Sequence, residues 1–149
     1  MKFYETTQGS CVNSDDLLRA FYFVSGKTVD ENNPEYQEFV RKCFDTSIVE
    51  EIPCNYKDLL YRGYKIAAIK LYRFNNKGAG LVESKNAVEA IMASLAENSV
   101  DDIRNLLQNG LKAEAFRLYR NLHTVEYDEA KNAVDEMEAA MAAENAATA

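Results

Sequence analysis

The chain is poor in the residue types that most catalytic, metal and disulfide sites require. Its 149 residues include no tryptophan, one histidine, two prolines and three cysteines. The cysteines are odd in number and lack CxxC spacing, so we expect reduced thiols in a cytoplasmic protein. The strings GxxxxGK[ST], GxGxxG, HExxH and GxSxG do not occur. The sequence therefore predicts a non-enzymatic protein that needs no metal and no cofactor.

Membranes and duplex DNA are also unexpected partners. The first ten residues, MKFYETTQGS, lack the apolar centre of a signal peptide, and no apolar run approaches the ~20 residues of a membrane span. The formal net charge of −7 argues against a protein that coats DNA. A chain with 47% hydrophobic and 28% charged residues has the composition of a globular protein.

A two-helix unit is written twice in this chain. The first copy reads GYKIAAIKLYR (63–73) and ESKNAVEAI (83–91), and the second reads GLKAEAFRLYR (110–120) and EAKNAVDEM (129–137). Polar residues recur together with apolar ones, which helical periodicity alone does not require. The identical pairs include Gly63/Gly110, Lys65/Lys112, Leu71/Leu118, Tyr72/Tyr119, Arg73/Arg120, Lys85/Lys131 and Val88/Val134.

Each copy predicts three helices. A short helix ends at Gly63 or Gly110, a second runs to about residue 74 or 122, and a longer third covers 81–97 or about 127–143. Ser99 is the expected N-cap of the short helix in the second copy. Because the third helices carry apolar stripes, the copies should pack on each other or on the N-terminal helices. The final MAAENAATA should fray.

The N-terminal third reads as acidic and mostly helical. Polar and apolar residues roughly alternate over 2–7, as in an edge strand. Ser14 is the expected N-cap of a helix that ends at Gly26, and Pro34 should begin a second helix after Asn33. The apolar stripe of that second helix consists of Tyr36, Phe39, Val40, Cys43 and Phe44. The segment 47–52 suits a strand or a helical turn equally well. We therefore predict a mainly α fold with an N-terminal helical subdomain (1–55), two repeats (56–99 and 100–149) and room for one short β-hairpin.

The repeated unit resembles a hairpin from a known family. KIAAIKLYR followed by ESKNAVEAI is similar to the helix-turn-helix of the C-terminal domain of the bacterial ribosomal stalk protein. In that family a VIK-x-VR helix precedes a glycine-rich turn and an L-KEAKDLVE helix. The family domain has strands beside these helices, whereas the flanks here read as helices. The resemblance implies a shared helical hairpin, common in small phage and bacterial proteins, and not a ribosomal role.

The same resemblance implies partner-binding residues, because the family holds translation factors through basic side chains on the hairpin. The matching positions are Lys65, Lys70, Arg73 and Lys85, and in the second copy Lys112, Arg117, Arg120 and Lys131. Residues 56–99 carry 7 basic and 4 acidic side chains, whereas 1–55 and 100–149 each carry 5 basic and 10 acidic ones. A basic island between acidic ends suits an acidic partner. The competing interpretation is a solvated helix face on which Lys85 pairs with Glu83 or Glu89.

Two functional hypotheses follow. The first is a cytoplasmic protein–protein interaction module, an adaptor or an inhibitor, that binds through Lys65, Lys70, Arg73, Lys85, Tyr72 and Tyr119. Tyrosine beside arginine can anchor an interface, although such a tyrosine more often fills a seam between helices. The alternative is an acidic nucleic-acid mimic, for example a phage or mobile-element antagonist of a host nuclease or CRISPR effector. That protein would act through acidic side chains such as Asp15, Asp16, Asp101 and Asp102. The oligomeric state stays open.

Overall fold

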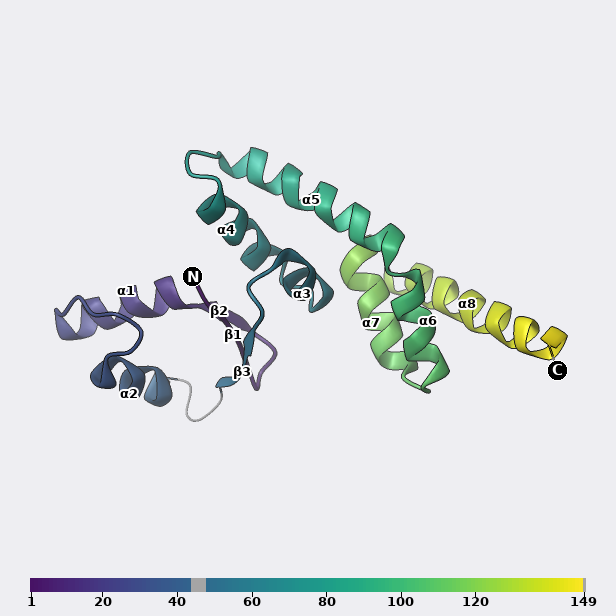
Figure 1. Ribbon diagram of the computed structural model, residues 1–149, viewed down its shortest axis with the longest axis horizontal. Coiled ribbons are helices and arrows are strands. Elements are labelled where there is room, and N and C mark those ends of the chain that lie inside the picture. Colours follow the sequence, from purple (N-terminus) through teal and green to yellow (C-terminus); the bar gives the residue numbers. More distant parts are fainter. Residues whose placement is uncertain (44–47, 149) are drawn as a thin grey trace.

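The computed structural model describes residues 1–43 and 48–148. Within these ranges the chain forms eight helices and one three-stranded antiparallel sheet, which confirms the predicted mainly α fold (Figure 1). The strands are β1 (Phe3–Thr6), β2 (Cys11–Asn13) and β3 (Ile48–Ile52). The helices are α1 (Ser14–Ser25), α2 (Pro34–Cys43), α3 (Tyr56–Tyr61), α4 (Lys65–Asn75), α5 (Leu81–Asn98), α6 (Val100–Gln108), α7 (Lys112–His123) and α8 (Tyr127–Thr148).

The sheet has the strand order β2-β1-β3. The predicted short hairpin is confirmed as β1 and β2, with Phe3 opposite Asn13. The expected edge position of β1 is wrong, because β3 pairs antiparallel with its other side and places Ile52 opposite Phe3. The ambiguous segment 47–52 is thus a strand from Ile48 onward. Phe3 and Ile52 are 0% and 1% exposed, so the sheet is anchored by its apolar side chains.

The cap of α1 differs from the sequence prediction by one residue. Asn13 is the N-cap with an extended backbone, and its Oδ1 accepts a hydrogen bond of 2.9 Å from the amide of Asp16. Ser14 is the first helical residue, and its hydroxyl oxygen instead accepts from the amide of Lys2 at 2.9 Å. Asn13 takes the capping role because it ends β2 in the β conformation that an N-cap requires. Gly26 ends the helix in the left-handed conformation, as expected.

The helices α1 and α2 share a small core of their own. Asn33 Oδ1 accepts from the amide of Tyr36 at 3.1 Å, and Pro34 is the first helical residue, which confirms the predicted start. The buried residues of this core are Leu17, Phe21 and Tyr36, and the rings of Phe21 and Tyr36 meet edge to face at 5.9 Å. Of the predicted α2 stripe, Phe44 lies outside the described residues.

The two repeats reproduce the same turn between their first and second helices. The amide of Gly63 donates to Leu60 and that of Tyr64 to Leu59, and Gly110 and the next residue donate equivalently to the last turn of α6. The φ angles of the two glycines are +85° and +75°. This is a Schellman ending, which needs a left-handed residue and therefore favours glycine. The prediction that both short helices end at these glycines is confirmed.

The repeats pack on each other through a core that also contains the sheet. Val88, Ile103 and Val134 are at most 1% exposed, and they share one apolar cluster with Phe3 and Ile52 of the sheet. Helix α7 packs against α3, α5, α6 and α8, so it occupies the centre of the C-terminal half. Helices α3 and α6 are further joined by the Tyr61 hydroxyl, which donates to an Asp102 carboxylate oxygen at 2.7 Å.

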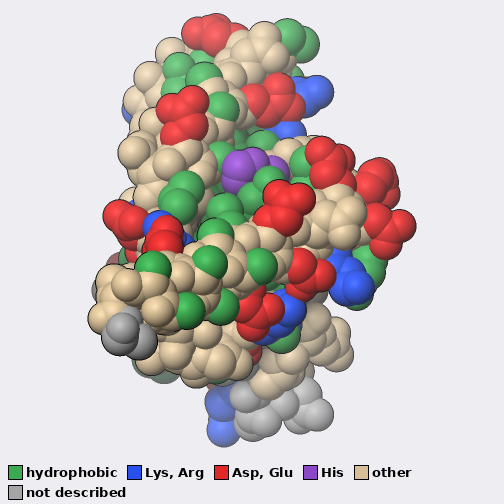
Figure 2. Space-filling model, turned by 90° about the vertical axis from the view of Figure 1, so that its right-hand side faces the viewer, with side chains coloured by type: hydrophobic (Ala, Val, Ile, Leu, Met, Phe, Trp, Pro, Cys, Tyr) green, Lys and Arg blue, Asp and Glu red, His purple; other side chains and the backbone are tan. Residues whose placement is uncertain are grey.

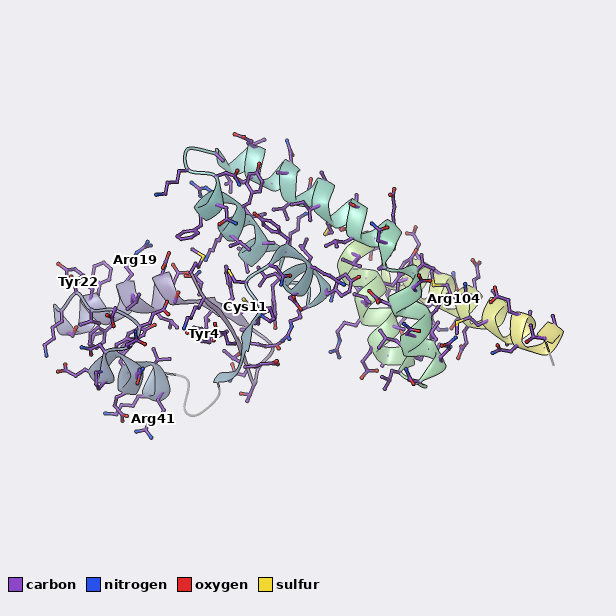
Figure 3. The ribbon with its side chains drawn as sticks, in the orientation of Figure 1. Tyr4, Cys11, Arg19, Tyr22, Arg41 and Arg104 are labelled. Atoms are coloured by element: carbon purple, nitrogen blue, oxygen red, sulfur yellow. The ribbon has the colours of Figure 1, made fainter. Side chains whose placement is uncertain are left out.

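The two ends of the second repeat differ in how well they were predicted. Ser99 is the N-cap residue of α6, as predicted, but its side chain makes no capping hydrogen bond, because its buried hydroxyl donates back to the carbonyl of Ala96 at 2.9 Å. Helix α8 does not stop near 143 but continues to Thr148. Its last turns project past α6 (Figure 1), and an ion pair between Arg104 and Glu144 ties it back to that helix (Figure 3). Among the described residues, no helix combines the length and hydrophobicity that a bilayer crossing requires.

Candidate functional site

One hollow of the described surface lies where the two repeats meet. We call it the basic groove, and its volume is about 810 Å³. Helix α7 and the three residues after it supply most of the lining, α5 supplies Met92, and Gly63 and Lys65 of the first repeat complete it. The lining residues are Gly63, Lys65, Met92, Ala113, Phe116, Arg117, Arg120, Asn121, Thr124, Val125 and Glu126.

One hydrogen bond between the repeats shapes this groove. Asn121 Nδ2 on α7 donates to the carbonyl oxygen of Tyr61 at 2.8 Å, just before α3 ends. The next turn contains Gly63, where an added Cβ would lie 2.8 Å from Asn121 Oδ1. The backbone of the first repeat therefore approaches α7 more closely than a side chain at position 63 would allow. Glycine is needed here for its size as well as for its left-handed backbone.

The groove holds two arginines with no acidic partner. Among the described residues, no carboxylate lies within the 4.0 Å ion-pair distance of Arg117 or Arg120, although Glu126 also lines the groove. The guanidinium carbon of Arg120 lies 5.9 Å from the centre of the Phe116 ring, which in turn meets Tyr127 edge to face at 5.0 Å. Arginine stacked on an aromatic ring is held in place while its N–H donors stay available.

The first repeat adds Lys65 to this groove, but that lysine is already paired. Its Nζ lies 2.7 Å from Glu89 Oε1 on α5, and Lys85 approaches the same carboxylate at 3.8 Å. The hydrogen bond from Lys65 lowers the pKa of Glu89, so this carboxylate stays ionised. The pairing of Lys85 with Glu89 is one of the two local pairs that the competing interpretation expected.

The remaining predicted cations of the first repeat lie elsewhere. Lys70 and Arg73 line a separate hollow between α4 and the start of α1. Lys70 Nζ is 3.0 Å from Asp16 Oδ2, and this hydrogen bond lowers the pKa of Asp16. Arg73 has no described carboxylate within 4.0 Å. The structure thus brings Lys65 together with Arg117 and Arg120 in the basic groove, whereas Lys70 shares one hollow with Lys65 and another with Arg73.

The other cations of the second repeat are divided in the same way. Lys112 Nζ lies 2.7 Å from Asp135 and 2.6 Å from Glu138, and these hydrogen bonds raise its pKa. Arg117 and Arg120 differ because they face the first repeat, where no carboxylate of the described ranges 1–43 and 48–148 lies within 4.0 Å of them. The family resemblance identifies both positions, but only the packing of the repeats indicates which basic residues are unpaired.

The two predicted tyrosines have different surroundings. Tyr72 is partly buried against the main core, and its ring centre lies 6.5 Å from that of Tyr56. Tyr119 is also partly buried, but its ring stacks on His123 at 4.0 Å with an interplanar angle of 17°. Both residues of this stack line a hollow between α5, α6, α7 and α8, so Tyr119 is the predicted tyrosine that faces an open site.

Candidate nucleophiles and bases are poorly placed for joint chemistry. His123 ends α7 in the second repeat, and burial lowers its pKa, so its imidazole is neutral at pH 7. Cys11 belongs to β2 near α4, and burial raises the pKa of its thiol to about 11 (Figure 3). A thiol with that pKa is protonated at pH 7 and is a weak nucleophile. Among the described residues, no three His, Cys, Asp or Glu side chains are grouped so as to hold a metal ion.

The acidic residues singled out in the sequence are partly used inside the fold. Asp16 pairs with Lys70, and Asp102 accepts the hydroxyl of Tyr61. Asp15 and Asp101 open α1 and α6, where carboxylates oppose the positive end of the helix dipole. A comparison of the chain with protein-family models, curated proteins and solved structures finds no match, so its function has to be argued from these grooves.

Proposed function

We propose that the chain is a non-enzymatic, cytoplasmic protein–protein interaction module, an adaptor or an inhibitor, that binds an acidic segment of its partner in the basic groove. The observation that carries this proposal is the pair of guanidinium groups, Arg117 and Arg120, that lack a carboxylate within 4.0 Å among the described residues. Both lie in a groove with Met92, Phe116 and other apolar side chains. The resemblance to a hairpin that holds translation factors through basic residues supports the same proposal.

The chemistry of the groove favours a carboxylate ligand with apolar neighbours. Guanidinium groups present paired N–H donors that match the two oxygens of a carboxylate. The floor contributes apolar contact through Met92, Ala113, Phe116 and Val125. Because the whole chain carries a net charge of −7, long-range attraction cannot draw in an acidic partner. Recognition therefore depends on short-range contacts in the groove, and both repeats are needed to form it.

A capture experiment tests this proposal. The double variant Arg117→Glu/Arg120→Glu reverses the charge of the groove, and Lys57→Glu/Lys77→Glu makes the same net change at two exposed lysines outside it. Each protein would be immobilised and exposed to extract of the source cells, and captured proteins quantified by mass spectrometry. We expect a partner held by wild type and by the lysine variant but lost with the arginine variant. A partner that the arginine variant retains in full would refute the assignment.

The nucleic-acid mimic is the second candidate, and one observation favours it. Helix α8 carries six carboxylates and one lysine. Acidic side chains are prominent on the face of the molecule shown in Figure 2, which is the side on which α8 ends. Asp135, Glu138 and Glu144 pair with Lys112 or Arg104. The carboxylates of Asp128, Glu129 and Glu136 have no basic side chain within 4.0 Å among the described residues.

The same capture experiment separates the two candidates. In the triple variant Asp128→Asn/Glu129→Gln/Glu136→Gln, the unpaired carboxylates of α8 are replaced by neutral groups of similar shape. If the protein mimics nucleic acid, this variant should lose a nucleic-acid-binding partner that the Arg117→Glu/Arg120→Glu variant keeps. If the basic groove is the binding site, the opposite pattern is expected. Far-UV circular dichroism of each variant would establish that the helices are intact.

A further inference from the structure

A second groove lies on another face of α7. We call it the apolar groove, and its volume is about 500 Å³. Side chains from α5, α6, α7 and α8 all contribute to it, among them Ala93, Ala96, Val100, Tyr119, Leu122 and Met137. In Figure 2 the single histidine of the chain lies in a strip of hydrophobic side chains, with acidic side chains on both sides.

The floor of the apolar groove is anchored in the main core. Leu122 is 2% exposed and belongs to the main core, so this part of the surface is anchored in the fold. The stacked rings of Tyr119 and His123 form a flat, rigid surface beside it. Between Glu89 and Glu97, α5 offers the small side chains Ala93 and Ala96 to the groove. A helix can approach another helix closely where such small residues face it.

The charged side chains that line the apolar groove itself are both acidic. None of its lining residues is lysine or arginine, and its rim carries Glu89 and Glu97. Glu89 is shared with Lys65 and Lys85, whereas Glu97 has no basic side chain within 4.0 Å among the described residues. Helix α8 supplies Met137 to the groove and also carries Asp128, Glu129 and Glu136, which have no basic side chain within 4.0 Å among the described residues. The groove thus joins an apolar floor to an acidic rim at Glu97.

We propose that the apolar groove binds a basic amphipathic helix of a partner protein. Apolar side chains at positions i, i+3, i+4 and i+7 would lie along Tyr119, Leu122 and Met137, as in other helix-in-groove interfaces. Lysine or arginine side chains on the flanks of that helix would pair with Glu97 and with the carboxylates of α8. A second copy of this chain is a poorer occupant, because its net charge of −7 repels the same acidic rim.

The probe is a fluorescein-labelled 18-residue peptide with leucines at helical i, i+3, i+4 and i+7 spacing and lysines on its polar face. Its control keeps every leucine and replaces the lysines by glutamates. Binding to the full chain would be followed by fluorescence anisotropy. We expect the lysine peptide to bind at least about tenfold more tightly than the glutamate peptide and to weaken as salt rises.

Matched variants locate the binding site. Ala93→Trp places a large side chain in the apolar groove, and Ala90→Trp makes the same change at an exposed position of α5 outside it. Glu97→Lys reverses the charge of the rim, and Glu83→Lys makes that change about 21 Å away along the same helix. Each groove variant should weaken the lysine peptide about tenfold relative to its control. Circular dichroism would establish that all four variants keep their helices.

Three results would overturn the proposal. Equal binding of both peptides would show that the charge of the surround plays no part. Groove variants that bind like their controls would show diffuse attraction to the acidic surface and not a site. A dimer in sedimentation equilibrium that Ala93→Trp disrupts and Ala90→Trp preserves would assign the groove to a second copy of this chain.

Discussion

Replacing Gly63 by alanine should destabilise the fold more than the equivalent replacement at Gly110. The two glycines end α3 and α6 in the same turn, with φ angles of +85° and +75°. An alanine in this left-handed region costs about 1–2 kcal/mol at either site. The substitution also restricts the unfolded chain by a similar amount in both cases, so this contribution cancels in the comparison. The surroundings of the two sites therefore decide the difference.

Those surroundings differ because only Gly63 faces the other repeat. An added Cβ at Gly110 meets nothing within 4 Å, whereas at Gly63 it would lie 2.8 Å from Asn121 Oδ1 and 3.0 Å from Asn121 Cγ. Asn121 must then move, which breaks its 2.8 Å hydrogen bond to the carbonyl of Tyr61. That bond contributes about 0.5–1.5 kcal/mol. We expect a total loss of about 2–3 kcal/mol for Gly63→Ala and about 1–2 kcal/mol for Gly110→Ala.

Urea unfolding followed by circular dichroism at 222 nm measures these free energies directly. The double variant Gly63→Ala/Asn121→Ala provides the decisive control, because it removes the side chain that the new Cβ would strike. In the Asn121→Ala background, Gly63→Ala should cost no more than Gly110→Ala, which gives a coupling energy of about 1 kcal/mol. Equal losses for the two single glycine variants, or additive losses in the double variant, would refute the close packing of the repeats at this turn.

Three further predictions concern the core, a hydrogen bond between the repeats and the histidine. Val134 is 1% exposed, so Val134→Asp should abolish cooperative thermal unfolding, because a buried unpaired charge costs several kcal/mol, comparable to the whole stability of a domain. Val82 is 73% exposed, and Val82→Asp should change stability by no more than about 0.5 kcal/mol in the same calorimetric scan. Tyr61→Phe removes the hydroxyl that donates to Asp102 and should lower the free energy of unfolding in urea by about 1 kcal/mol. An unchanged free energy of unfolding would show that water replaces this hydrogen bond without loss. Burial lowers the pKa of His123 below its ordinary 6.5, so the unfolded chain binds more protons than the folded one as the pH falls below 6.5. The stability that this residue contributes is present above pH 6.5 and is lost as the pH falls below it. The free energy of unfolding of His123→Phe should therefore fall less between pH 7 and pH 5 than that of wild type. Parallel curves of unfolding free energy against pH for the two proteins would contradict this expectation.

Helix ends were predictable where the signal lies within a few neighbouring residues. Gly63 and Gly110 end their helices because the Schellman turn depends on the conformation of one residue and on backbone bonds inside the same turn. Pro34 after Asn33 is an equally local signal. The cap of α1 was assigned one residue late, because Asn13 and Ser14 are both good capping residues. Their roles were decided by β2, whose extended backbone ends at Asn13.

Long-range pairings could not be read from the sequence. The alternating segment at the N-terminus indicated a strand, but its central place in the sheet depends on β3, which pairs with it from far along the chain. Local propensity does not contain the information about which distant segment supplies the partner.

The candidate sites divide in the same way between sequence and structure. The duplication, the mainly helical fold and the basic positions of each hairpin were determined by the sequence itself, because periodicity, turn residues and repeated polar residues are properties of neighbouring positions. The tertiary structure alone decided which of those cations stay unpaired. It placed Asp16 beside Lys70 and Glu89 beside Lys65, and it left Arg117 and Arg120 facing a groove. Ion pairing depends on distances of a few ångströms between helices, and those distances exist only once the two repeats and the N-terminal sheet have packed together.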